Sequence, residues 1–305
     1  MEIFSFTLNQ MIYFFILILV GYCVNKFKII DGDFDRIISK FLSFVVTPAL
    51  IIESFYEKFK INVLKENFIL LITAIITVVL LFILANILSK LFTKDLYIRK
   101  IYTYSFTNAN FGYMGYVLVE ALFGANALFK MIVFTIPFNI YAFTIGINSF
   151  NPNIQKITVK SMVTPVTISL VIGAVLGLSG IVLPDTVNSA IGSLSDTMGP
   201  LAMIMTGFII AKYNVFEIMK NSGVILASLI RLIVIPLCVV FMMKIFKTDG
   251  LTLMVALCTT AMPFGLNGIV FPAAYGQDTK TGAAMALISD ILAIITIPVM
   301  FGLFI

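Results

Sequence analysis

Two asparagines, Asn110 and Asn267, stand inside long apolar stretches of the chain. An amide side chain offers a ligand both hydrogen-bond donors and an acceptor, and burying it without a partner is costly. Each asparagine also has glycines close by, within TNANFGYMGYVLVEA (107–121) and TAMPFGLNGIVFPAA (260–274). We therefore predict that both asparagines bind a ligand, with a structural role as the alternative.

The two strings resemble each other, because Thr107 and several residues after it recur at a constant offset, starting from Thr260. Proline removes a backbone donor, and glycine supplies flexibility and lets another backbone approach closely. A helix with these residues at its centre is predicted to break there. The candidate ligand-binding residues at the two breaks are Asn110, Gly112, Gly115, Pro263, Gly265 and Asn267. For Gly115, close helix packing is the alternative.

Arg231 and Asp290 are ionisable residues inside apolar segments, where such residues usually serve a function. Counting residues from the segment ends at about 1.5 Å each places both about 14–15 Å deep. They could form a buried ion pair that stabilises the fold. Alternatively, Arg231 binds a carboxylate of the ligand, because a guanidinium matches carboxylate geometry. Asp290 would then be the ion-coupling residue that carries a proton, since the chain has no histidine to do so.

The composition identifies the elements that must position these residues. Sixty per cent of the residues are hydrophobic, 11% are charged, and the mean hydropathy is +1.09, which is typical of an all-α integral membrane protein. A window of about 20 apolar residues predicts ten transmembrane helices. Their predicted ranges are 8–27, 36–56, 67–89, 101–123, 127–149, 157–179, 187–211, 222–246, 251–275 and 281–304.

Charge and cysteine usage exclude several kinds of site. The three cysteines lie in apolar segments without metal-ligand spacing, so we expect no metal site, no disulfide framework and no cofactor. The net charge of +5 requires no nucleic acid, because membrane proteins keep Lys and Arg on cytoplasmic loops. With the N-terminus outside, thirteen of the 20 Lys and Arg residues fall on the cytoplasmic side and six on the outer side. We therefore expect a multi-pass protein of the cell membrane with both termini outside.

The matched strings belong to a longer internal repeat. Helices 1–5 (1–150) are echoed in order by helices 6–10 (151–305), and because five is odd the second copy must be inverted. The breaks in helices 4 and 9 can then meet at the bilayer midplane, where half-helix N-termini favour anions. Inverted repeats with matching broken helices are typical of secondary transporters.

Several longer motifs resemble those of one family. They are FLSFVVTPALIIESF (41–55), the NxGxxG string from Asn110 to Gly115, TPVTISLVIGAVLGLSGIVLP (164–184), MGPLAMIMTGFII (198–210), RLIVIPL (231–237), AMPFGLNGIVFPAAYG (261–276) and ITIPV (295–299). Together they are similar to the auxin efflux carrier family, which includes plant auxin exporters and bacterial permeases proposed for malate and malonate. The resemblance covers essentially the whole chain.

The resemblance implies a ten-helix fold shared in outline with bile-acid sodium symporters. Helices 1, 2, 6 and 7 would form a scaffold, and helices 3–5 and 8–10 a transport core whose broken helices 4 and 9 cross. Small organic anions, either auxin-like carboxylates or dicarboxylates such as malate, would bind at the crossing. The chain departs from the family at Val117, where a proline is frequent, and in having no carboxylate in helix 9, which weakens the case for sodium coupling.

Other functions compete with transport by alternating access. A non-transporting membrane sensor with a transporter fold is the main alternative, followed by a channel or an intramembrane enzyme. The absence of histidine excludes HExxH metalloproteases and Ser-His proteases, so we do not expect an enzyme. The expected partners are a small organic anion, the lipid bilayer and a second copy of the chain joined through the scaffold helices, without nucleic acid.

Overall fold

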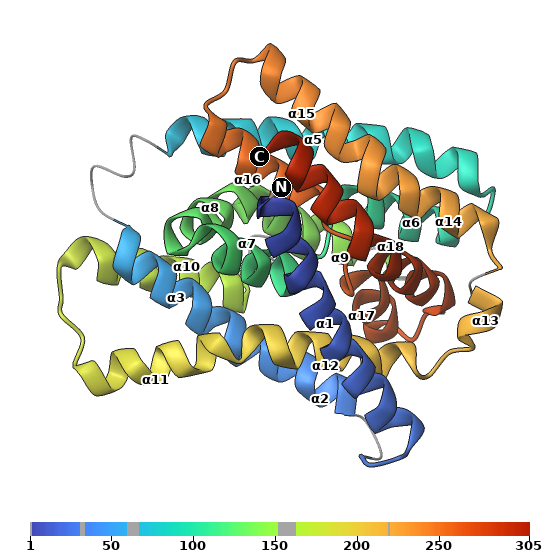
Figure 1. Ribbon diagram of the computed structural model, residues 1–305, viewed down its shortest axis with the longest axis horizontal. Helices are drawn as coiled ribbons and strands as arrows, with labels where there is room; N and C mark the ends of the chain where they lie inside the picture. Colours follow the sequence, from blue (N-terminus) through green and yellow to red (C-terminus); the bar gives the residue numbers. More distant parts are fainter. Residues whose placement is uncertain (1, 31–33, 60–66, 152–162, 219) are drawn as a thin grey trace.

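The computed structural model describes residues 2–30, 34–59, 67–151, 163–218 and 220–305 (Figure 1). Within them the regular structure is helical, apart from one isolated β-bridge. Seven continuous stretches of the described chain are long and apolar enough to cross a membrane. They are Ile3–Lys26, Phe34–Lys58, Phe68–Phe92, Ala125–Ser149, Asp185–Ile210, Ser222–Ile245 and Lys280–Phe304. The chain is therefore an all-α membrane protein, and these stretches coincide with seven of the predicted ranges.

Several of the long stretches contain a π-helical turn, labelled η. The first half of the chain forms α1 (Glu2–Lys26), α2 (Phe34–Phe41), η1 (Leu42–Val46), α3 (Thr47–Lys58), α5 (Phe68–Phe92), α6 (Leu96–Thr107), η2 (Phe111–Gly115), α7 (Tyr116–Phe123), α8 (Ala125–Tyr141), η3 (Ala142–Gly146) and α9 (Ile147–Ser149). The second half forms α10 (Pro165–Ser179), α11 (Asp185–Asp196), α12 (Met198–Ile210), α13 (Val215–Ile218), α14 (Ser222–Leu229), η5 (Ile230–Val234), α15 (Ile235–Ile245), α16 (Gly250–Thr260), α17 (Asn267–Ala274) and α18 (Lys280–Phe304).

Two of the predicted membrane helices are interrupted at the matched strings. One stops with α6 at Thr107 and resumes with η2, and the other stops with α16 at Thr260 and resumes with α17. The interruptions lie against each other, because Ala109 and Phe264 form the antiparallel β-bridge and the Asn110 N–H donates to the Pro263 carbonyl oxygen at 2.8 Å. Each break thus supplies hydrogen-bond partners to the other, which non-helical backbone requires at membrane depth.

The helices that lead into the breaks begin at capping side chains. The Asp95 carboxylate accepts hydrogen bonds from the N–H groups of Tyr97 and Ile98, and the Asp249 carboxylate accepts one from the Thr252 N–H at 2.9 Å. Such caps satisfy donors that have no partner within the helix. These aspartates therefore fix where α6 and α16 start.

Two helix pairs approach so closely that only glycine fits between them. A Cβ atom at Gly207 of α12 would lie 1.8 Å from the Ile18 carbonyl oxygen of α1, and one at Gly21 of α1 would lie 1.9 Å from the Ile204 oxygen of α12. A Cβ atom at Gly177 of α10 would lie 2.6 Å from a backbone oxygen of α3. In Figure 1, α1 crosses α12 in the lower part of the view, and α3 lies beside α10 at the left.

Candidate functional site

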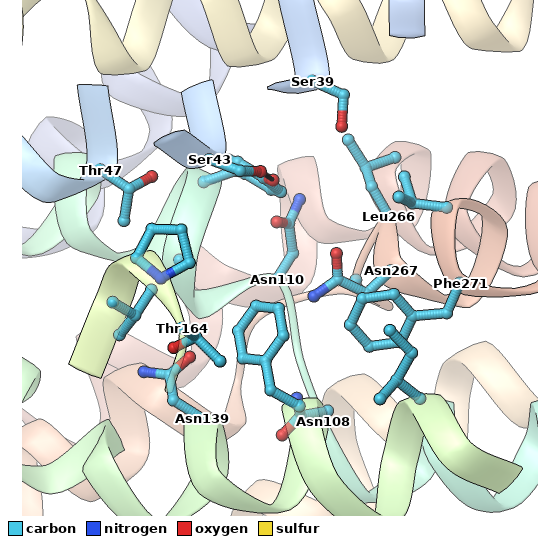
Figure 2. Close-up of a pocket in the computed structure, with 18 of the residues that line it drawn as sticks. Ser39, Ser43, Thr47, Asn108, Asn110, Asn139, Thr164, Leu266, Asn267 and Phe271 are labelled. Carbon is cyan, nitrogen blue, oxygen red and sulfur yellow. Dashed lines mark hydrogen bonds between the residues drawn. The ribbon is translucent and has the colours of Figure 1, made fainter. Parts of the chain in front are cut away.

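A cavity of about 560 Å³ lies where the two interruptions meet (Figure 2). Helices α2, η1, α3 and the start of α10 line one side of it, and the interrupted segments, α8 with η3, and α17 line the other. The polar residues in the lining are Ser39, Lys40, Ser43, Thr47, Tyr104, Asn108, Asn110, Tyr113, Asn139, Thr164 and Asn267. Because the remaining lining is mostly aliphatic and aromatic, the cavity is apolar with a ring of hydrogen-bonding groups.

Asn110 and Asn267 occupy the middle of this cavity, with Ser43 and Thr47 on one side and Asn108 and Asn139 on the other (Figure 2). The Asn110 side chain is 3% exposed, and its Oδ1 atom has no hydrogen-bond partner within the described structure. The Oδ1 atom of Asn108 is equally unpartnered, while its Nδ2 donates to the Tyr104 hydroxyl at 3.2 Å. Buried acceptors of this kind normally have partners, so the cavity is suited to a ligand that donates hydrogen bonds.

The backbone at two helix ends in the cavity lining favours negative charge. The N-terminal ends of η2, at Phe111, and of α17, at Asn267, both belong to the lining. Helix N-termini carry unpaired N–H groups and a partial positive charge, and they favour anions. Lys40 is the one charged residue of the lining within the described chain. Two half-helix ends and one lysine therefore favour a negatively charged ligand.

Arg231 lies outside the cavity lining, close to the C-terminal ends of α6 and α16, which carry partial negative charge. Its side chain, in η5, is 1% exposed. The Nη1 atom donates to the Phe106 carbonyl oxygen at 2.9 Å, and Nε donates to the Met262 carbonyl oxygen at 3.3 Å. These oxygens lie at the C-terminal end of α6 and just after that of α16, where helices expose unpaired carbonyls and partial negative charge. Arg231 thus connects the two breaks by hydrogen bonds and does not line the cavity, and its contact with a ligand carboxylate stays a prediction.

Of the other residues predicted at the breaks, some line the cavity, and the rest pack or form hydrogen bonds outside it. Gly112 and Gly265 line the cavity, but a Cβ atom at Gly265 would lie 3.1 Å from the Ala109 carbonyl oxygen, whereas one at Gly112 would meet nothing within 4 Å. Gly115 is a packing glycine, because its Cβ atom would lie 2.8 Å from Met131 Cε. Pro263 contributes the carbonyl oxygen that accepts the Asn110 N–H. Neither Gly115 nor Pro263 belongs to the lining.

Asp290 lies away from the cavity and does not pair with Arg231. Its side chain is 5% exposed, and neither carboxyl oxygen has a hydrogen-bond partner within the described structure. It lines a second cavity, between α1, α12 and α18. Counting along a helix gives the depth of a residue but not the direction it faces, and for this reason the shared depth of the two residues suggested a pair that does not form.

Sequence reasoning missed the polar residues that face the breaks from the other helices. The Ser43 hydroxyl of η1 lies 3.1 Å from the Tyr113 hydroxyl of η2, so it joins the two sides of the cavity directly. Thr164 caps α10 by accepting a hydrogen bond from the Thr167 N–H at 3.2 Å, and it also belongs to the lining. Ser43 lies within one quoted motif, and Thr164 begins another. A polar residue directly before a proline was the available signal for Thr47 and Thr164, but not for Ser43.

The chain is similar in sequence to a family of membrane transport proteins and to proteins named as transporters. The family model described as "Membrane transport protein" matches residues 6–161 and 153–301. A protein of Methanocaldococcus jannaschii named "Uncharacterized transporter MJ1031" is 25% identical over 301 residues, which cover 92% of this chain and 94% of that protein. "Uncharacterized transporter YfdV" of Escherichia coli K12 is 18% identical over 306 residues, which cover 96% of each chain.

Proposed function

Because the chain belongs to the membrane transport protein family, we propose that it is a secondary active transporter of small organic anions, which bind in the cavity where the two helices are interrupted. The observation that carries this proposal is the division of charge around the breaks. The half-helix N-termini and Lys40 line the cavity, while Arg231 binds carbonyl groups at the C-terminal ends on the far side. An anion is therefore favoured in the cavity without a metal or a second cation.

Alternating access would arise from movement between two groups of helices. In this proposal α1, α2 with α3, α10 and α11 with α12 form the scaffold, and the interrupted helices with α5, α8, α14, α15 and α18 form the moving core. The glycine contacts between α1 and α12 support a rigid scaffold, and the cavity lies between the two groups. The inverted repeat of 1–150 and 151–305 supplies two related core halves, as in other secondary transporters.

The lining favours a monocarboxylate with an apolar body over a dicarboxylate such as malate. Aromatic side chains contribute much of it, from Phe44, Phe143, Phe271, Tyr104 and Tyr113. A dicarboxylate would place a second charged group against a mostly apolar wall, whereas an aromatic acid leaves its ring against the aromatic side chains. The unpartnered oxygens of Asn108 and Asn110 favour a ligand that also carries an N–H or O–H donor. An indole carboxylate, which is auxin-like, meets all three conditions.

We further propose that protons rather than sodium drive transport, with Asp290 as the proton carrier. Asp290 is a buried carboxyl group with no partner in the described structure, and it lies on α18, a helix that packs against α1. A change of charge there would act on the contact between scaffold and core rather than on the bound anion. Coupling of this kind leaves the cavity free to hold the substrate alone.

The decisive experiment is uptake of radiolabelled indoleacetate and malate into liposomes that contain the purified protein. We expect saturable uptake of indoleacetate. Unlabelled malate should compete only weakly with the labelled indoleacetate for uptake. Asn110→Ala and Asn267→Ala should each weaken binding about tenfold or more, because a hydrogen bond to a charged group contributes about 1.5–3 kcal/mol. Asn126→Ala, at an exposed position at the start of α8, is the matched control and should bind as the wild type does.

The same measurements separate transport from the alternatives. Tight indoleacetate binding without any uptake would identify a sensor that retains the transporter fold. Unchanged affinity in both cavity asparagine variants would place the binding site elsewhere. Preference for malate over indoleacetate would overturn the assignment of the substrate class while leaving transport intact.

A further inference from the structure

A second cavity of about 260 Å³ lies between α1, α12 and α18, and it is separate from the cavity at the two breaks. Its walls are almost entirely apolar, with Phe15, Ile18 and Leu19 of α1 facing Leu287 and Ile291 of α18. The polar side chains in its lining are those of Tyr22 and Asp290. A single carboxyl group therefore stands in a hydrophobic pocket.

The carboxyl group of Asp290 has no partner in the part of the chain that the structure describes. Both of its oxygens are buried and lack hydrogen bonds. Arg231, a buried cation in the described helices, already donates hydrogen bonds to the carbonyl oxygens of Phe106 and Met262. Lys26 lies over the Tyr22 ring, 5.6 Å from its centroid, at the end of α1. An unpaired carboxylate in an apolar wall is costly, so this group needs either a proton or a cation from outside the chain.

The lining fits an organic cation better than a metal ion. Hard cations such as Ca²⁺ take six to eight oxygen ligands, whereas here the side-chain oxygens are those of Asp290 and Tyr22. No group of three or more metal-ligating side chains occurs among the described residues. An ammonium group needs one carboxylate, and its hydrocarbon body gains from apolar and aromatic walls.

We propose that this cavity is a binding site for a small lipophilic ammonium ion, whose charged group pairs with Asp290 and whose apolar body packs between α1 and α18. The volume suits a small arylalkylamine, since the pockets of larger, drug-sized ligands measure about 300–1,000 Å³. Leu19 in the lining and Ile16 nearby on α1 are 45% and 54% exposed on a helix long and apolar enough to cross the membrane. A lipophilic amine that partitions into the bilayer can therefore reach the cavity from the lipid.

Such a ligand would also act on transport, and this part rests on the proposed function. The cavity lies between the proposed scaffold helices α1 and α12 and the core helix α18. A bound amine would oppose their relative movement and would replace the proton on Asp290. It should therefore inhibit uptake without competing with the anion. The binding itself requires no transport and is measured separately.

Phenylpropylamine is a suitable probe, with phenylpropanol and phenylpropanoate as neutral and anionic controls of the same shape. Binding of each is measured by calorimetry and by thermal stabilisation of the full-length purified protein. We expect the amine to bind at least tenfold more tightly than either control. Asp290→Asn should remove this preference, and Asp196→Asn, which changes an exposed carboxylate on α11, should retain it.

Leu19→Phe tests the same site without touching the charge, by filling part of the cavity. It should lower amine affinity at least tenfold while leaving indoleacetate binding unchanged, and it decides the question if Asp290→Asn does not fold. Equal binding of amine and alcohol, or an amine affinity that survives both Asp290→Asn and Leu19→Phe, would overturn the proposal. Amine binding that displaces indoleacetate competitively would do the same, because it would place both ligands in one cavity.

Discussion

Replacing Arg231 with methionine should destabilise the folded protein while leaving anion affinity nearly unchanged. The guanidinium donates two hydrogen bonds to carbonyl oxygens beside the two breaks, at 2.9 Å and 3.3 Å. Hydrogen bonds to a charged group contribute about 1.5–3 kcal/mol each, and the lower value suits a membrane interior, so the loss is about 3 kcal/mol. At about 2–4 °C per kcal/mol for a chain of this size, the melting temperature should fall by about 6–12 °C.

Thermal melting of the purified variants and binding isotherms with indoleacetate test this prediction together. Arg231→Lys should give an intermediate loss, because one ammonium group cannot reproduce the fork of the guanidinium. Lys94→Met, which removes an exposed positive charge after α5, should melt as the wild type does. If Arg231→Met left the melting temperature unchanged and strongly weakened anion binding, the reasoning would be refuted. Arg231 would then be assigned to the binding site.

Three further predictions concern the breaks, the coupling and the topology. Gly265→Ala should lower stability by about 1–3 kcal/mol, because the added Cβ atom would lie too close to the Ala109 carbonyl oxygen. Gly112→Ala, whose Cβ atom would meet nothing within 4 Å, should leave melting and affinity unchanged, and equal effects of the two substitutions would contradict this account of the contact between the breaks. Uptake should follow an imposed pH gradient and not a sodium gradient, and Asp290→Asn should abolish the response to pH without weakening indoleacetate binding; a strict sodium requirement in both proteins would disprove it. A reporter that is active only in the cytoplasm should be silent when fused after Ile305, and strong activity would reverse the predicted orientation.

Helix positions followed from the sequence much more closely than the directions in which side chains point. A stretch of apolar residues sets the length of a membrane helix, and Pro263 with its neighbouring glycines breaks a helix locally. Both features depend on residues that are close together in the sequence, so the sequence predicts them well. The partners of Arg231 lie at the end of α6 and just after the end of α16, and they could not be read from its own segment. Ser43 and Thr47 escaped notice because serine and threonine in helices commonly bond to their own turn. Only the packing of η1 against η2 shows that Ser43 lies across from Tyr113.

The contact between the two breaks also imposes an order on the assembly of the chain in the membrane. When α6 is synthesised, the Phe106 carbonyl oxygen has no hydrogen bond from Arg231, and the Asn110 N–H cannot yet donate to the Pro263 carbonyl oxygen, because both partners are still to come. Exposed backbone groups of this kind are unfavourable in lipid. The first interrupted helix therefore reaches its final state only after the second half of the chain has been inserted, and truncation before Arg231 should yield a product that the membrane's quality control recognises as incomplete.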